Sequence, residues 1–225
     1  MEVREWMVDI FTDIIVISIV LAGLSMVQFF KGRKINLNLM YFSMKKAEEA
    51  LHPVDKNYTL VGIYTGYSAK YILRGLVEEA ELVVLLMPRQ ALLYYPIALI
   101  TSRFDRFYLR LVYRGRVGVE AHVIKSGYYR LGVKRTIRGY ERMGKEEVVI
   151  DGVKYHVLYT SKDAALKLLD WVKRQSKPTL INHVALVPAN NSLYLAAKLD
   201  VDHYKGLVES AYYLARSLTD RFVET

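Results

Sequence analysis

The feature that most constrains this chain is a long apolar stretch near its N-terminus. From Ile14 to Phe30 the sequence carries no charged residue for 17 positions. As an α-helix rising about 1.5 Å per residue, this stretch nearly crosses the roughly 30 Å hydrocarbon core of a bilayer. The alternative is a buried helix of a soluble domain, but such a helix usually keeps a polar stripe. We therefore interpret the stretch as a membrane anchor.

The residues that flank the apolar stretch predict its direction. Trp6 and Phe30 lie where interfacial anchors are expected, and Lys31, Arg33 and Lys34 follow the stretch directly. The first 13 residues instead hold four acidic residues against one basic residue. Basic residues beside a span are retained in the cytoplasm, so we expect a single-pass protein of the cell membrane with its N-terminus outside. A cleaved signal peptide would carry its basic residues before the apolar run.

The remaining sequence has room for one domain built from two parts. We divide the chain into an anchor (1–34), a basic strand-rich part (35–146) and a C-terminal part (147–225). Cysteine is absent, which excludes disulfides, thiolate metal sites and cysteine nucleophiles. A quarter of the residues are charged and few are Asn or Gln, a composition typical of thermophile proteins.

The first half of the predicted cytoplasmic domain alternates short apolar runs with turn residues. Asn38 is placed to cap a helix over 39–51, and residues 58–64 and 68–73 read as a hairpin. The apolar runs 82–87 and 91–100 are interrupted by proline, so neither spans a bilayer. We predict that both are buried strands, with a membrane-surface loop as the alternative.

Strict alternation of arginine or tyrosine with apolar residues predicts a half-buried strand over 104–113. The runs 117–125 and 128–134 are predicted as two further strands. Residues 135–145 are polar and basic and are predicted to form an exposed loop.

The last third shows the pattern hairpin then helix twice. Asp151-Gly152 predicts a tight turn between strands 147–150 and 153–160, and Ser161 is placed to cap a helix over 162–174. A second hairpin, 179–187 with 192–199, precedes a helix that we expect Asp202 to cap. Two ββα units with both helices on one sheet face predict an α+β fold, a mixed, mainly antiparallel sheet after a single transmembrane helix.

This C-terminal pattern resembles that of uncharacterised prokaryotic membrane-anchored proteins with an α+β cytoplasmic domain. The resemblance rests on residues 155–169 (YHVLYTSKDAALKLL), the second hairpin and the closing amphipathic helix. It covers about a third of the chain, contains no catalytic motif and implies the architecture alone.

All of the excess positive charge lies in one fifth of the sequence. Residues 101–145 hold 12 Lys or Arg against three acidic residues, a balance that equals the net charge of +9 for the whole chain. The candidate binding residues are Arg103, Arg106, Arg110, Arg114, Arg116, Arg130, Lys134, Arg135 and Arg138. Three interpretations remain open: a solvated face, a surface for anionic lipid headgroups or an acidic protein partner, and a nucleic-acid surface.

The sequence predicts no catalytic residue, no metal site and no cofactor. His183 shares a strand face with apolar residues and is expected in the core, whereas His156 is expected at the surface. A membrane-tethered enzyme that uses His156 or His203 is the alternative class of function. The leading hypothesis is a membrane-anchored binding or scaffold module, acting as an accessory subunit of a membrane complex.

Overall fold

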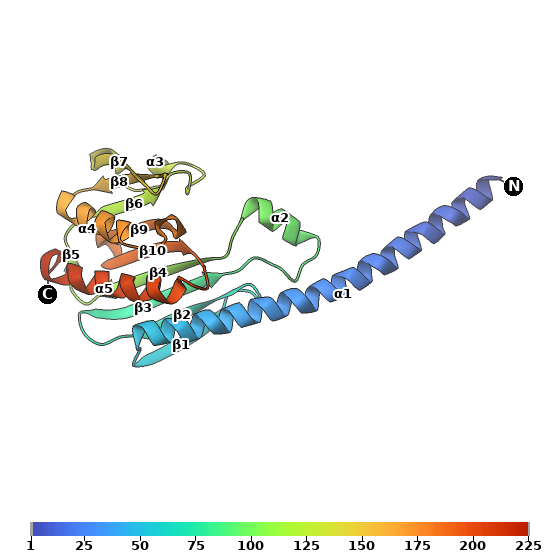
Figure 1. Ribbon diagram of the computed structural model, residues 1–225, viewed down its shortest axis with the longest axis horizontal. Helices are drawn as coiled ribbons and strands as arrows, with labels where there is room; N and C mark the ends of the chain where they lie inside the picture. The colour runs from blue at the N-terminus through green and yellow to red at the C-terminus, as the bar shows by residue number, and fades with distance from the viewer. Residues whose placement is uncertain (1, 225) are drawn as a thin grey trace.

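The structure is a computed structural model that describes the backbone of residues 2–224 and the side chains of residues 10–224. Helix α1 (Glu2–Leu51) is continuous, so the prediction that a new helix begins after Asn38 is wrong. No proline interrupts residues 31–38, and packing against the sheet domain from Gly32 onward supports the helix through this region. The anchor and the first helix of the domain are therefore one rod (Figure 1).

The N-terminal part of α1 projects away from the rest of the molecule (Figure 1). Its most apolar window has a mean hydropathy of 2.4 and is not buried at all, with Ile14 and Phe30 both more than half exposed. Among the described residues, α1 is the helix that is long and apolar enough to cross a membrane. Trp6 belongs to α1, but its side chain lies outside the described part of the chain.

The C-terminal part of α1 packs against the domain along one narrow face. Gly32, Asn36, Met40, Ala47 and Leu51 are buried along this face, mostly at multiples of three or four residues, the spacing of one helix face. Their neighbours on the opposite side, such as Leu37, remain exposed. The first fully buried position of this face, Gly32, comes two residues after the apolar stretch ends, so no flexible linker separates the stretch from the domain.

Gly32 is a position where α1 approaches the domain closely. A Cβ atom placed there would lie 2.3 Å from the backbone carbonyl carbon of Arg89, which cannot move as a side chain would. We expect Gly32→Ala to destabilise the domain by about 1.5 kcal/mol, within the range typical of overpacking. Chemical unfolding of the full chain in mild detergent would measure this. Gly23→Ala, which meets no atom within 4 Å, is the matched control and should be neutral or slightly stabilising.

The domain is built on one nine-stranded antiparallel sheet. Its strand order is β1-β2-β3-β4-β10-β9-β6-β8-β7, so strands from both predicted parts of the domain pair directly. The strands are β1 (Asp55–Leu60), β2 (Gly66–Ile72), β3 (Val77–Leu85), β4 (Arg106–Tyr113), β6 (Ala121–Lys125), β7 (Gly144–Ile150), β8 (Val153–Tyr159), β9 (Ile181–Val187) and β10 (Ser192–Lys198). A second small sheet pairs β5 (Arg116–Val117) with β11 (Val223–Glu224).

Helices α4 (Lys162–Lys173) and α5 (Tyr204–Phe222) cover one face of the sheet together with the second half of α1 (Figure 1). The two predicted hairpin–helix units are confirmed, and both helices bury their expected apolar stripes. The helix starts differ in detail. Ser161 occupies the N-cap of α4 without a side-chain capping bond, and the N-cap of α5 is His203 rather than Asp202.

Two of the predicted strands are wrong and a third is divided. Residues 91–100 form a segment that contains helix α2 (Tyr94–Thr101) instead of a buried strand. Residues 128–134 belong to an irregular cover over the second sheet face, which contains the short helices α3 (Val133–Thr136) and η1 (Tyr140–Arg142). The predicted strand 117–125 is interrupted by residues 118–120 between β5 and β6. For residues 91–100 the reason is that the flanking strands β3 and β4 pair with each other, which leaves no place between them in the sheet.

Candidate anion-binding site

The structure separates the predicted basic region into paired and unpaired residues. Arg110 forms an ion pair with Glu81 on the neighbouring strand, and Arg114 lies 3.5 Å from Glu78. Lys134 lies 2.6 Å from Glu141 within the irregular cover. Arg116, Arg135 and Arg138 are exposed. These six residues, two-thirds of the predicted binding residues, do not line the pocket described next.

The other three predicted residues, Arg103, Arg106 and Arg130, converge on one pocket of about 820 Å³. Lys125 and Lys198 also line it, which the sequence analysis missed. We call this hollow the basic pocket. Its remaining lining residues are Thr101, Ser102, Phe104, Ser126, Gly127, Tyr128 and Asn182.

Strand pairing brings these distant residues together. Arg106 begins β4 and is paired in register with Lys198, which ends β10. Lys125 ends β6, next to the start of β9 in the sheet. Because neighbouring strands are antiparallel, the start of one and the end of the next lie at the same edge of the sheet. The basic pocket is built at that edge, and only the pairing order could have revealed it.

Asn182 sits at an irregular point of β9. The register of β9 with β10 passes from His183 directly to Ile181, so Asn182 is the extra residue of a β-bulge. Its side chain lines the basic pocket although the residue is only 4% exposed. Within the described part of the chain its amide group makes no hydrogen bond. The amide is not one of the fully buried polar groups that lack a partner, which among the described residues are the Ser192 and Tyr204 hydroxyls. It can therefore bond to a polar ligand in the pocket.

The electrostatics of the basic pocket favour an anion. Five of its lining residues are cationic, and no acidic side chain lines it within the described residues. Burial, with the nearby charge of Lys198, lowers the pKa of Lys125. Lys125 Nζ donates to the Thr179 carbonyl at 2.9 Å, which fixes the ammonium group in place. Bound negative charge would relieve the repulsion between these cations.

A polar junction holds α1, the pocket edge and α2 together. Arg89 donates two hydrogen bonds to the carboxylate of Asp105, at 3.0 and 2.5 Å, and a third to Asn36 Oδ1 at 2.9 Å. Asn36, which is fully buried in α1, donates in turn to the carbonyls of Tyr64 and Met87. Arg89 comes before the segment that contains α2 and Asp105 comes after it. Their ion pair therefore joins the two ends of that segment.

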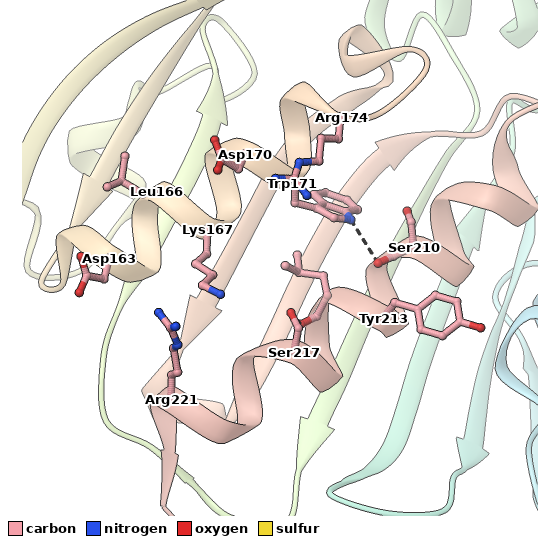
Figure 2. A pocket seen from close by; sticks show the side chains of 11 residues that line it. Asp163, Leu166, Lys167, Asp170, Trp171, Arg174, Ser210, Tyr213, Ser217 and Arg221 are labelled. Carbon is pink, nitrogen blue, oxygen red and sulfur yellow. Dashed lines mark hydrogen bonds between the residues drawn. The ribbon is translucent and has the colours of Figure 1, made fainter.

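A second hollow of about 740 Å³ lies between α4 and α5 (Figure 2). Trp171 Nε1 donates to the Ser210 carbonyl at 3.1 Å across the base of this groove. Charged side chains of both signs surround it, including Asp170 and Arg174. This mixed lining does not select for either sign of charge, in contrast to the basic pocket.

The histidines occupy structural positions. His183 is buried as predicted, with Nε2 3.1 Å from His122 Nδ1 and Nδ1 2.8 Å from the Tyr129 hydroxyl. His156 is partly exposed and lies 3.1 Å from Glu147, and His203 lies 2.7 Å from Asp200 at the start of α5. Among the side chains of residues 10–224, no group of three metal-ligating residues gathers at one place.

No protein-family model matches the chain, and no curated protein matches it either. Among solved structures, the mycobacterial trehalose monomycolate transport factor A, TtfA, is 10% identical in sequence. It aligns with a TM-score of 0.40 over 80% of this chain and 93% of that chain. A likeness at this level carries no argument about the present protein.

Proposed function

We propose that this protein is a membrane-anchored binding module whose basic pocket holds an anionic lipid headgroup. The N-terminal part of α1 spans the cell membrane, and the sheet domain lies on the cytoplasmic side as a scaffold for a membrane complex. The observation that carries the proposal is the basic pocket, which five cationic side chains line together with the Asn182 amide and, among the described residues, no acidic side chain.

The position of the basic pocket supports a lipid ligand. Lys31, Arg33 and Lys34 mark the end of the apolar stretch, and Arg33 lies over the Tyr64 ring at 4.9 Å, so part of this charge is fixed on the domain. Because α1 is continuous and docks from Gly32, the domain is held close to the bilayer surface. Residue Arg130 of the pocket donates to the carbonyl of Thr101 in α2, on the side from which the apolar part of α1 emerges.

The test compares two soluble lipid analogues on the full chain in nonionic detergent. Dihexanoyl-phosphatidylglycerol carries the anionic headgroup, and dihexanoyl-phosphatidylcholine is its zwitterionic match. We expect calorimetric titration to show binding of the first and not the second, weakening as salt is raised. We expect Arg106→Gln with Lys198→Gln to weaken binding about thirtyfold, since each basic residue near an anionic surface contributes about 1 kcal/mol.

The matched control is Arg114→Gln with Lys134→Gln, which removes two charges of the same sequence region outside the pocket. This control should bind like the parent chain. Equal losses in both double variants would mean that net charge, and not the pocket, determines binding. Inorganic phosphate provides a third arm: if it binds as tightly as the lipid analogue, the pocket accepts free phosphate and the lipid assignment is wrong.

A further inference from the structure

Helix α2 and its flanks form an apolar segment that the domain leaves uncovered. Residues 91–102 contain no charged residue, and Arg89 and Arg103 lie on either side of them. Leu93 is 79% exposed and Ile100 is 76% exposed, and Tyr94, Ile97 and Leu99 are also exposed. Ala98 is the buried residue of the helix. A soluble surface rarely leaves so many large apolar side chains together without a partner.

The α2 segment lies beside the end of the apolar stretch of α1. Gln28 Nε2 donates to the Arg89 carbonyl at 2.5 Å, and Gly32 contacts the same peptide, five residues before α2 begins. Figure 1 shows α2 projecting from the sheet towards the N-terminal half of α1, beyond the ends of the strands. The segment is therefore placed at the level where α1 would leave the bilayer.

The loop between β1 and β2 adds further apolar surface at this end. Tyr64 packs edge-on against Phe29 at 5.9 Å between ring centres, which places the loop beside α1. Leu60 and Ile63 are 64% and 73% exposed in the same loop region. The α2 segment and the β1–β2 loop thus both present apolar side chains next to the apolar part of α1.

We infer that α2 is a second membrane contact that inserts into the interfacial layer of the bilayer beside α1. This inference rests on the proposed spanning role of α1. Eight helical residues rise about 12 Å, too little to cross the membrane but enough to lie within its interface. The tyrosine at the helix start and Arg103 directly after the segment match the chemistry of the headgroup region, whereas Arg89 is held in the junction with Asp105. Continuity with α1 favours lipid over a protein partner.

Together the two contacts determine the orientation of the domain. A single helix would leave the domain free to rotate about the helix axis, whereas α1 and α2 define a plane. Arg103 ends the α2 segment and lines the basic pocket, so insertion of α2 would turn the pocket towards the headgroups.

The test uses spin labels on single cysteines, which the cysteine-free chain allows without other changes. The full chain is reconstituted in vesicles of phosphatidylcholine and phosphatidylglycerol. The variants are Val20→Cys in α1, Ile97→Cys and Ile100→Cys in α2, and Val149→Cys, an exposed apolar residue of β7. We expect the labels in α1 and α2 to collide more often with oxygen, which dissolves in the bilayer, than with a polar nickel reagent. We expect the label at position 149 to collide more often with the nickel reagent.

The outcomes separate the inference from the proposed function. If the Val20 label is lipid-exposed but both α2 labels are as accessible to nickel as the Val149 label, α2 does not enter the membrane and the inference is wrong. If the Val20 label itself is accessible to nickel, the spanning role of α1 fails. A variant with Ile97→Gln and Leu93→Gln provides a second measurement: it should reduce the oxygen preference of a label at position 100 without lowering the unfolding midpoint.

Discussion

Arg89→Met is expected to lower the free energy of unfolding by about 3 kcal/mol, because it leaves the carboxylate of Asp105 without its counter-ion. The side chains of Arg89 and Asp105 are only 16% and 10% exposed, so solvent screens the remaining charge weakly. The same change removes the hydrogen bond to Asn36 and loosens α1 from the base of the α2 segment. Denaturant unfolding of the full chain in mild detergent would measure the loss.

Arg110→Met is the matched control for this prediction. Arg110 also pairs with a carboxylate, but the side chains of Arg110 and Glu81 are 37% and 34% exposed on the open sheet face. Such a pair contributes at most about 1 kcal/mol. Adding Asp105→Asn to Arg89→Met should recover part of the stability, since the uncompensated charge is removed. Equal losses for Arg89→Met and Arg110→Met would show that the junction is not a buried ion pair.

Local patterns in the sequence predicted most of the helices and hairpins. Two examples are the spacing of the apolar residues in α5 and the Asp151-Gly152 turn. Each is determined by residues only a few positions apart in the chain. Both are confirmed, with Asp151 and Gly152 at positive φ angles of 49° and 73°. The alternation over β4 is confirmed as well, with Phe107 and Leu109 buried and Arg106 and Tyr108 partly exposed.

The α2 segment shows where local patterns fail. A run of apolar residues near a proline suits a buried strand as well as a short helix. The choice depends on whether the sheet has a free edge to receive it. Here β3 and β4 pair with each other directly, so the chain between them lies outside the sheet. The alternative of a membrane-surface loop, which followed from the same residues, agrees with its exposure.

The basic pocket illustrates a second limit of sequence reasoning. Clustering along the chain identified Arg103, Arg106 and Arg130, but it also included Arg110 and Arg114, which pair with acids on β3. It missed Lys198, which is 92 positions from Arg106 in the chain but directly paired with it. The density of charge along the chain located the region of the pocket. Which residues line the pocket depends on how the strands pair.

Acidification from pH 7 to pH 5 is expected to destabilise the domain through His183. Burial, and next the charge of His122, lower the pKa of His183 well below its ordinary value of 6.5. The unfolded chain then binds a proton that the folded chain does not, so the stability is complete above pH 6.5 and declines as the pH falls towards the lowered pKa. The slope approaches about 1.4 kcal/mol per pH unit. Most carboxylates titrate below this window.

His183→Gln should flatten this pH dependence, because glutamine can still bond to Tyr129 but takes no proton. The groups that face His183 are His122, Tyr129 and Tyr194, and His122 Nε2 reaches Glu120 at 3.0 Å. His156→Gln changes a partly exposed histidine on β8 and should retain the slope. Unfolding measured at half-unit steps of pH would compare the three chains. An unchanged slope in His183→Gln would place the titrating group elsewhere, whereas a flat profile would show that protonation of the buried His183 is what destabilises the fold.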